Sequence, residues 1–501
     1  MLTSHISRWS LRALVVYTGA CVLVVEILAT RILAPHFGSS LTTLSSVLGI
    51  TLGALSIGYY AGGLLGEKHA SWSRLGMILL ASGFTTIWIW PLSVIALPLL
   101  EGQLSVGIGA IIASLLLFLI PCGILGTLSP YVIAIEESLA PGISAGRAAG
   151  NIYFWSTLGS IAGSIAAGFL LIPLLGVRML IGGIGGSLLI LGCAVILISA
   201  RSRKGIWIAL PIALLAGAAI SIPERSLAIF TTEGVYQRIG VHDMEIGGRK
   251  IRVLWQDRNA SSGIDLNSED YAFDYTRAPQ VAWTGREPPQ TSLVIGAGAF
   301  VIPDAIARSS PEAVVDVVDI EPDLEEIATK FFGHVPSERV RSVVADGRVF
   351  LRTAGTYDLI VADAYQATYA IPVHLTTKEF FTLAKEHLTE SGLFIGNFIG
   401  SADTARKAYL PSAMRTFLDV FPEGQFFAMN DPKSKELQNV MFIACKESGR
   451  CIDPCSIALQ KSLDPILSTL CDRPIDVSAS DLSNHTLLTD DYAPVEWLNS
   501  M

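Results

Sequence analysis

The sequence has little charge. Asp, Glu, Lys and Arg make up 16% of its 501 residues, whereas hydrophobic residues make up 51%. The shortage is uneven, because charged residues are sparse up to about Ile222 and return to an ordinary frequency beyond it. A chain of this length has room for two or three domains. The change in composition therefore predicts a membrane domain over residues 1–223, followed by a polar part.

Three other features are missing. Lys and Arg number 35 against 44 Asp and Glu, and the net charge of -9 argues against a nucleic-acid partner. The first apolar run, Leu11–Leu33, is too long for a cleavable signal peptide and has no small-residue cleavage site. The cysteines include no C-x₂-C pair of the type that binds zinc, and we expect no metal site.

The apolar part contains about seven runs that are long enough to cross a bilayer. They are Leu11–Leu33, Leu44–Leu65, Leu75–Leu97, Leu104–Leu128, Ile152–Leu175, Met179–Ala200 and Ile206–Ile222. The last run is short and could instead lie at the membrane interface. Glycines four residues apart recur in these runs and predict a compact helical bundle; the pairs are Gly49/Gly53, Gly58/Gly62, Gly159/Gly163 and Gly182/Gly186.

Two charged residues, Glu26 and Arg31, lie near or within the first apolar run. A charge inside a membrane is costly and by default suggests a function, such as a translocation path. The alternative, which we favour, is that Arg31 extends to the interface while Glu26 pairs with it or faces a polar neighbour.

The polar part is organised around residues 291–363. A short apolar run, Leu293–Ile295, predicts a buried parallel strand that leads into Gly296 and Gly298 and then into a helix over Val301–Arg308. Glycine lets the backbone approach a ligand closely, and a helix N-terminus offers free N–H groups. The two glycines alone are a weak signal of a nucleotide-binding loop.

Acidic residues follow the next three predicted strands. Val314–Ile320 ends at Asp319, Val340–Val344 leads to Asp346-Gly347, and Tyr357–Val361 leads to Asp363. The carboxyl ends of parallel strands meet at one sheet edge, where ligands bind, and Asp319 lies at the usual distance for an acid that meets ribose hydroxyls. Each Asp could instead be only a helix N-cap. Three of them on successive strand ends favour a nucleotide site.

A small β-rich piece precedes this stretch. Residues 236–241 and 249–255 alternate as strands do, and Gly247-Gly248 between them predicts a hairpin turn. Leu266–Trp283 then looks helical. The large sheet continues with strands and helices at Leu393–Phe398, Gln425–Ala428, Val440–Cys445, Thr376–His387 and Ala402–Phe421. The polar part thus divides into residues 226–289 and 290–501.

An ordered set of segments carries a family resemblance: Val235–Ile239, Tyr271–Arg277, Val318–Pro322, Ala345–Arg348, Tyr357–Tyr365 and the ending Leu488–Glu496. Together they resemble the spermidine synthase family of polyamine aminopropyltransferases, in particular the members with an N-terminal multi-pass membrane region. The resemblance implies an α-helical transmembrane bundle followed by an α/β Rossmann-like domain of the S-adenosylmethionine-dependent methyltransferase type, with a small N-terminal β subdomain. It also implies a homodimer formed through the catalytic domain.

In that family, decarboxylated S-adenosylmethionine donates an aminopropyl group to an amine. The resemblance implies that Asp363 is the catalytic acid that orients and deprotonates the attacking amine. An ammonium must lose a proton before it can attack, and a carboxylate within hydrogen-bond reach can take that proton. The donor is a co-substrate, and no permanently bound cofactor is implied.

The resemblance also implies a set of binding residues. Gln237 would contact the aminopropyl side of the donor, Asp319 the ribose hydroxyls and Asp346 the adenine amino group, while Gly296 and Gly298 would line the donor. Candidates for cation–π contacts in the acceptor pocket are Tyr236, Tyr275 and Tyr365. Tyrosines at such positions are at least as often plain core.

The chain departs from the family at three places, one in the loop whose Asp binds the free amine of the donor and two on the acceptor side. The family's first loop is typically Gly-Gly-Gly-Asp-Gly, whereas this chain has Ala299 in place of the Asp, followed by Phe300. Gln366 stands where a second Asp usually follows the catalytic one, and Arg277 stands where a Glu is usual. Loss of two carboxylates with Arg277 nearby predicts a pocket that is less attractive to putrescine.

Two other functions stay open. Without the Asp at position 299, a donor that keeps its carboxylate could be tolerated, which suggests an S-adenosylmethionine-dependent methyltransferase that acts on a small or membrane-delivered substrate. The third hypothesis is a transporter or scaffold with an inactive or regulatory nucleotide domain. Glu26 and Arg31 would then mark a translocation path.

The side of the membrane that holds the polar part is ambiguous. Seven crossings and the positive-inside rule place it outside the cell, given the basic residues Arg8, Arg12, Lys68, Arg74, Arg147, Arg201, Arg203 and Lys204. The cysteines Cys445, Cys451, Cys455 and Cys471 could form disulfides, which need an oxidising compartment, or remain thiols. A nucleotide-type donor is normally available inside, and on this ground we expect a cytoplasmic catalytic domain.

Overall fold

The computed structural model describes the chain except for residues 1, 39, 101–102, 105, 140–143, 200–227, 258, 269–270, 285–286, 365–371, 404–407, 448–464, 479, 496–497 and 499–501. The chain divides into two compact units, Met1–Ser226 and Leu227–Met501. Each unit has its own hydrophobic core.

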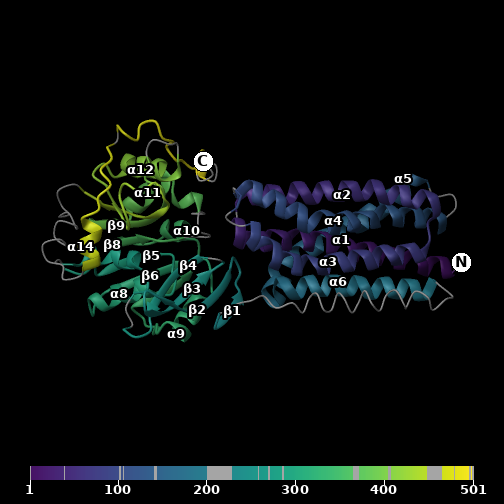
Figure 1. Cartoon of the computed structure of the whole chain (residues 1–501), viewed down its shortest axis with the longest axis horizontal. Helices are drawn as coiled ribbons and strands as arrows, with labels where there is room; N and C mark the ends of the chain where they lie inside the picture. The colour runs from purple at the N-terminus through teal and green to yellow at the C-terminus, as the bar shows by residue number, and fades with distance from the viewer. Residues whose placement is uncertain are drawn as a thin grey trace. The chain divides into compact units, whose positions relative to one another are not determined.

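The N-terminal unit is a bundle of long apolar helices (Figure 1). They are α1 (Leu2–Phe37), α2 (Leu41–His69), α3 (Trp72–Leu100), α4 (Val106–Leu139), α5 (Ala145–Ala166) and α6 (Ile172–Ser199), with the π-helical turn η1 (Ala167–Leu171) between the last two. Large apolar side chains such as Phe169 and Ile198 lie on the outside of the bundle, 86% and 88% exposed. Extensive apolar exposure of this kind is typical of a surface that meets lipid or protein.

Five helical stretches among the described residues are long and apolar enough to cross a membrane: Arg8–Phe37, Leu41–Glu67, Trp72–Leu100, Gly107–Leu139 and Ala145–Ser199. The last is 55 residues long and is interrupted at Gly176, whose φ of 70° and ψ of 166° are not helical. It therefore contains both runs that were predicted separately, Ile152–Leu175 and Met179–Ala200, except for Ala200, which lies outside the described residues. The seventh predicted run, Ile206–Ile222, lies outside the described residues.

Some of the predicted glycine pairs lie at helix contacts. A Cβ at Gly58 or Gly62 of α2 would collide with the backbone of α4, and a Cβ at Gly159 of α5 would collide with the backbone of α1. Gly49 and Gly53, in contrast, face open space among the described residues. Close backbone approach thus explains only part of the glycine pattern.

Glu26 faces a polar neighbour in the bundle. Thr51 Oγ1 of α2 donates a hydrogen bond to Glu26 Oε1 at 3.1 Å, which is one of the two arrangements expected for this carboxylate. A second polar cluster joins α1, α4 and α5, because Arg8 Nη2 and Asn151 Nδ2 both donate to Glu136 Oε1, at 3.2 Å and 2.9 Å.

The C-terminal unit begins with a four-stranded antiparallel sheet of order β1-β2-β3-β4. Its strands are β1 (Phe230–Glu233), β2 (Arg238–Ile246), β3 (Arg249–Gln256) and β4 (Asn259–Asp265). Gly247 and Gly248 form the β2–β3 turn as predicted, with φ of 59° and 77°. The expected helix over Leu266–Trp283 is only the 3₁₀ helix η2 (Asp274–Ala282). Asp265 Oδ1 accepts the N–H groups of Asn267 and Ser268 and holds a turn at the start of this stretch.

The large sheet has seven strands in the order β10-β11-β9-β8-β5-β6-β7. They are β5 (Thr291–Ile295), β6 (Val314–Asp319), β7 (Val340–Val344), β8 (Tyr357–Ala362), β9 (Leu388–Gly400), β10 (Gln425–Ala428) and β11 (Gln438–Cys445). Strands β5 to β9 are parallel to their neighbours, whereas β11 pairs antiparallel with both β9 and β10. This unit therefore has the α/β Rossmann-like fold that the sequence predicts.

Helices cover both faces of this sheet (Figure 1). One face packs against α8 (Val301–Ser309), α9 (Leu324–Phe331) and α14 (Pro465–Cys471), and the other against α10 (Gly347–Leu351), η3 (Val373–Leu375), α11 (Lys378–Glu386) and α12 (Tyr409–Val420). Strand residues alternate between the two cores; Val294 faces the first, while Leu293 and Ile295 face the second. This alternation is the reason that parallel strands read as continuous apolar runs.

An ion pair fastens the C-terminal tail to α10. Arg348 Nη1 and Nη2 donate to the two carboxylate oxygens of Asp490 at 2.7 Å and 2.6 Å. Thr377 Oγ1 donates to the same carboxylate at 2.8 Å. The side chain of Arg348 is 10% exposed and that of Asp490 is 43% exposed. The tail is thereby held beside the loop that follows β7.

We expect Arg348→Ala to lower the free energy of unfolding by about 2 kcal/mol. Hydrogen bonds to charged groups are worth roughly 1.5–3 kcal/mol, and the half-exposed Asp490 regains water when its partner is removed. Thermal melting of the full chain in detergent measures the change. Arg352→Ala, on an exposed position one turn further along, is the control and should stay within about 0.5 kcal/mol of the parent. Equal losses in the two variants would contradict this role for Arg348.

Candidate active site

The carboxyl ends of four parallel strands meet at one sheet edge. Three backbone hydrogen bonds continue the pairing past the strand ends: Gly296 N–H to Val318 O at 2.9 Å, Ala345 N–H to Asp319 O at 2.9 Å, and Asp363 N–H to Ile295 O at 2.8 Å. Gly296, Asp319 and Asp363 therefore lie in a row along this edge. It is the place where such sheets bind ligands.

The first glycine of the loop is required by its contact with β8. Gly296 has φ of 99°, and a Cβ at this position would collide with the carbonyl oxygen of Asp363. Gly298 has φ of 51°, and its Cβ would lie 3.2 Å from the Cβ of Ser262 in β4. The backbone conformation and the close contacts thus explain why glycine stands at both positions. Their contact with a donor remains a prediction.

The departure at Phe300 has a packing explanation. Phe300 precedes α8 with a left-handed backbone, φ 61° and ψ 13°, which costs a non-glycine residue about 1–2 kcal/mol. Its ring is fully buried and lies 4.4 Å from the ring of His334. His334 Nδ1 is in turn 2.8 Å from Asp304 Oδ1 of α8. Burial of the aromatic ring in this core offsets the backbone strain.

Asp319 ties the end of β6 to the glycine loop. Its Oδ2 accepts the Ala297 N–H at 2.8 Å, and its Oδ1 accepts the Glu321 N–H at 2.9 Å. Burial raises the pKa of Asp319, although these backbone hydrogen bonds act in the opposite direction. A carboxylate oxygen can accept more than one hydrogen bond. Asp319 therefore keeps acceptor capacity for ribose hydroxyls, which is its proposed role.

Glu321 is a second carboxylate of this region, and the sequence reasoning gave it no role. It is 2% exposed, and its two oxygens accept the N–H groups of Val235 and Tyr236 at 2.9 Å and 3.0 Å. It thereby holds the turn that carries Gln237, whose side chain is buried, while Tyr236 is 54% exposed. The sequence did hold a signal for a role of Glu321, because this residue lies two positions after Asp319 at the same strand end.

Asp346 is an N-cap of α10. Its Oδ1 accepts the Val349 N–H at 2.9 Å, and its Oδ2 lies 2.7 Å from His374 Nε2. The N-cap alternative considered for this residue is therefore present in the structure. Contact with the adenine amino group remains a prediction, and His374 is a neighbour that the sequence did not indicate.

Asp363 follows β8 and is held by an amide. Asn397 Nδ2 of β9 donates to Asp363 Oδ1 at 2.8 Å, and Asn397 Oδ1 accepts from Asn439 Nδ2 of β11 at 3.0 Å. Burial raises the pKa of Asp363 to about 7, and the hydrogen bond from Asn397 only partly counteracts this. A general base works best when its pKa lies near the operating pH.

The acceptor-side candidates are only partly placed. The Tyr275 hydroxyl donates to the Ser261 carbonyl; burial, and then the charge of Asp363, raise the pKa of Tyr275. Arg277 lies over the ring of Tyr271 at 4.9 Å, and its charge does not contribute to the pKa of Asp363. Tyr365 lies outside the described residues.

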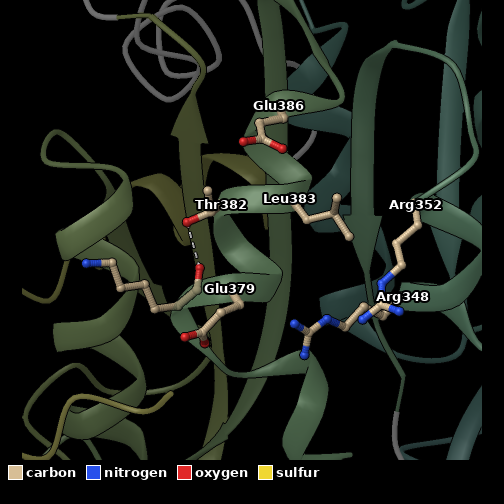
Figure 2. Close-up of a pocket in the computed structure, with 7 residues that line it drawn as sticks. Arg348, Arg352, Glu379, Thr382, Leu383 and Glu386 are labelled. Carbon is tan, nitrogen blue, oxygen red and sulfur yellow. Dashed lines mark hydrogen bonds between the residues drawn. The ribbon is translucent and has the colours of Figure 1, made fainter. Parts of the chain in front are cut away.

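A separate open pocket of about 290 Å³ lies between α10 and α11 (Figure 2). Its lining is Arg348, Arg352, Lys378, Glu379, Thr382, Leu383 and Glu386. None of the predicted site residues lines it. The candidate active site is the strand-end edge with Asp363, where Gly296, Asp319 and Asp363 lie together.

Comparison with known proteins gives relatives for this region. No known family model matches the chain. The polyamine aminopropyltransferase of Vibrio vulnificus (strain CMCP6) is 28% identical over 233 residues, which are 45% of this chain and 75% of that protein. The eEF1A lysine and N-terminal methyltransferase of Homo sapiens is 30% identical over 125 residues, 23% of this chain and 18% of that protein. A solved structure of a probable spermidine synthase from Corynebacterium glutamicum ATCC 13032 has a TM-score of 0.40 and 21% identity, over 47% of this chain and 86% of its own.

The sequence relatives named polyamine aminopropyltransferase align with the C-terminal half of the chain. This is the half that holds the strand-end edge and the segments on which the resemblance was based. The expected resemblance is thus confirmed for the C-terminal half of this chain, which is similar in sequence to polyamine aminopropyltransferases.

Proposed function

We propose that the C-terminal unit transfers an aminopropyl group from decarboxylated S-adenosylmethionine to an amine, with Asp363 as the base. The observation that carries this proposal is the state of Asp363. Its backbone lies beside Gly296 at the carboxyl edge of the parallel strands, its carboxylate accepts a hydrogen bond from Asn397, and burial raises its pKa to about 7. The relation to polyamine aminopropyltransferases supports the same reaction.

The reaction balances with this one base. The amine nitrogen attacks the methylene carbon beside the sulfonium, the C–N bond forms as the C–S bond breaks, and the electron pair goes to the sulfur. Asp363 takes the proton that the amine loses. The leaving group is a neutral thioether, methylthioadenosine, so that in-line positioning is the main further requirement. Gln237, Asp319 and Asp346 would provide that positioning on the donor side, and dimerisation through this unit remains part of the proposal by resemblance.

The N-terminal unit is proposed to anchor the enzyme in a lipid bilayer. Its five long apolar stretches and its exposed apolar side chains support this role. The disulfide-bonded state of Cys445 and Cys471 counts against the expected cytoplasmic location, because disulfides persist in oxidising compartments.

Alkylation tests this disulfide state. In denatured protein without reductant, we expect iodoacetamide to leave Cys445 and Cys471 unmodified, because a disulfide has no thiolate to react. The free cysteines Cys21, Cys122 and Cys193 serve as internal controls and should react completely. After reduction all five should react, as measured by peptide mass spectrometry. Complete alkylation of Cys445 without reductant would remove the objection to a cytoplasmic catalytic unit.

A methyltransferase is the second candidate function. Ala299 puts no carboxylate at the position where the family's Asp meets the donor amine, and the human methyltransferase is among the relatives. Product analysis of the full chain in detergent separates the two. With decarboxylated S-adenosylmethionine and a diamine we expect methylthioadenosine. Formation of S-adenosylhomocysteine from intact S-adenosylmethionine, with no methylthioadenosine from the decarboxylated donor, would favour the methyltransferase.

A further inference from the structure

Two asparagines extend from Asp363 across the sheet. Strands β8, β9 and β11 are adjacent, and Ala362, which precedes Asp363, pairs with Gly396, which precedes Asn397. Asn397 lies opposite Met441, and Asn439 is two residues away on the same strand. Residues at such diagonal positions share one face of a sheet. Asp363, Asn397 and Asn439 therefore form a continuous polar row on an otherwise apolar surface.

The hydrogen bonds along this row have one direction. Asn439 Nδ2 donates to Asn397 Oδ1 at 3.0 Å, and Asn397 Nδ2 donates to Asp363 Oδ1 at 2.8 Å. An ionised carboxylate can only accept hydrogen bonds, and an amide has its donor and its acceptor at opposite ends. The row is thus matched to the ionised form of Asp363, which is the form that acts as a base.

We propose that Asn439 is a positioning residue for the reaction, and that it acts through Asn397 to hold Asp363 Oδ1 as an acceptor and leave Oδ2 to take the proton of the amine. The proposal rests on the proposed role of Asp363 as the base. Among the described residues, Oδ2 of Asp363 has no hydrogen-bond partner, and Asn397 is the one side chain that bonds Oδ1. Oδ2 of Asp363 is therefore the oxygen that would accept the proton of the amine.

Within the described part of the chain, no nearby charge replaces the amide row. The titratable group there that interacts with Asp363 is Tyr275 of η2, whose hydroxyl donates to the Ser261 carbonyl. Within the described residues no Lys or Arg contributes to the charge state of Asp363. Residues 365–371, which follow Asp363 in the sequence, contain no Asp, Glu, Lys or Arg. Weakening the row should therefore show directly in the ionisation of Asp363.

Asn439→Leu tests the proposal. It removes the donor that fixes Asn397, and we expect the pH midpoint of kcat/KM to rise by about 0.5–1 unit; Asn397→Leu should raise it by about 1–2 units, since a hydrogen bond to a charged group is worth that much. At pH 6.5 the Asn439 variant should be about 3- to 10-fold less active, and at pH 9 close to the parent. Asn439→Gln keeps an amide donor and should restore part of the shift.

Controls separate positioning from stability. Met441→Leu changes the residue two positions after Asn439 on the same strand, opposite Asn397, and should leave the midpoint unchanged. Thermal melting and donor binding report whether each variant is folded. Equal loss of activity by Asn439→Leu at every pH, or an unmoved midpoint in a folded variant, would overturn the proposal. If Asp363→Asn keeps its activity, the base assignment itself fails; an inactive Asp363→Asn with an unmoved midpoint in Asn439→Leu overturns only the role of Asn439.

Discussion

Asp363→Asn should lower kcat by at least about 100-fold, and the dissociation constant of the donor should change by less than about threefold. General-base catalysis typically contributes about 10²–10⁴-fold, and an amide cannot take the proton of the amine. Asn has the shape of Asp, and its side-chain oxygen can still accept the hydrogen bond from Asn397. Steady-state kinetics and calorimetry of the full chain measure the two quantities.

The parent enzyme should show a matching pH dependence. Burial raises the pKa of Asp363 from 3.8 to about 7, so that below pH 7 the base is increasingly protonated and kcat/KM should fall about tenfold per pH unit. Above pH 7 the Asp363 limb should be level. Asp363→Asn should lack this limb altogether. An active Asn variant with the same limb would remove Asp363 from the mechanism.

Ionisation of Asp363 should raise the activity of the enzyme and lower the stability of its folded state. In the unfolded chain Asp363 ionises near pH 3.8, whereas in the folded chain it ionises near pH 7. The unfolded state therefore binds fewer protons between these values, and stability falls as the pH rises through this window, by at most about 4 kcal/mol. Asp363→Asn should be at least as stable as the parent at pH 8, which thermal melting would show. Such an exchange of stability for activity is common at active sites.

Gly296→Ala should have the largest effect on folding, with a loss of more than about 4 kcal/mol in the free energy of unfolding. Its φ of 99° is unfavourable for any residue with a Cβ, and the new methyl group would collide with the backbone oxygen of Asp363. Backbone cannot move aside as a flexible side chain can, and strain at special backbone positions is one of the few causes of such large losses. We expect little folded protein, and any folded fraction should have lost activity.

Two other glycines separate the cost of backbone strain from the cost of the steric collision at Gly296. Gly333 has φ of 75° but open space around its Cβ position, so Gly333→Ala should show the backbone strain alone, about 1–2 kcal/mol. Gly355 has open space and no left-handed backbone, and Gly355→Ala should stay within about 1 kcal/mol of the parent. Thermal melting of the three variants gives the comparison. A Gly296 variant no less stable than the Gly333 variant would contradict the close approach to Asp363.

Local patterns predicted most of the large sheet. The apolar run Leu293–Ile295 and the Asp after each of the next strands need only chain-local information, because the side-chain period and the strand ends are set within a few residues. Parallel pairing then places the strand ends together. The glycine turn at Gly247-Gly248 is equally local.

Features that depend on distant pairing could not be predicted. Asn397 and Asn439 meet only because β11 inserts between β9 and β10. In the sequence Asn397 is a polar residue within an apolar strand, and Asn439 follows Gln438 at the start of another strand. The Glu321 carboxylate bonds a turn that is 86 residues away in the chain. The helix expected over Leu266–Trp283 is shorter in the structure, where the Asp265 side chain accepts hydrogen bonds from the backbone that follows it. Such side-chain hydrogen bonds compete with helix formation and do not show in the apolar periodicity.

We expect the acidic strand ends to hold an adenosyl sulfonium next to Asp363. Isothermal titration of the full chain in detergent with decarboxylated S-adenosylmethionine at pH 8 measures this binding. We predict saturable binding that Asp319→Asn weakens at least about tenfold, through loss of the charged hydrogen bonds to ribose. Glu312→Gln, in the exposed turn that precedes β6, is the control and should leave the binding unchanged. A folded protein that binds neither this donor nor intact S-adenosylmethionine would contradict the account.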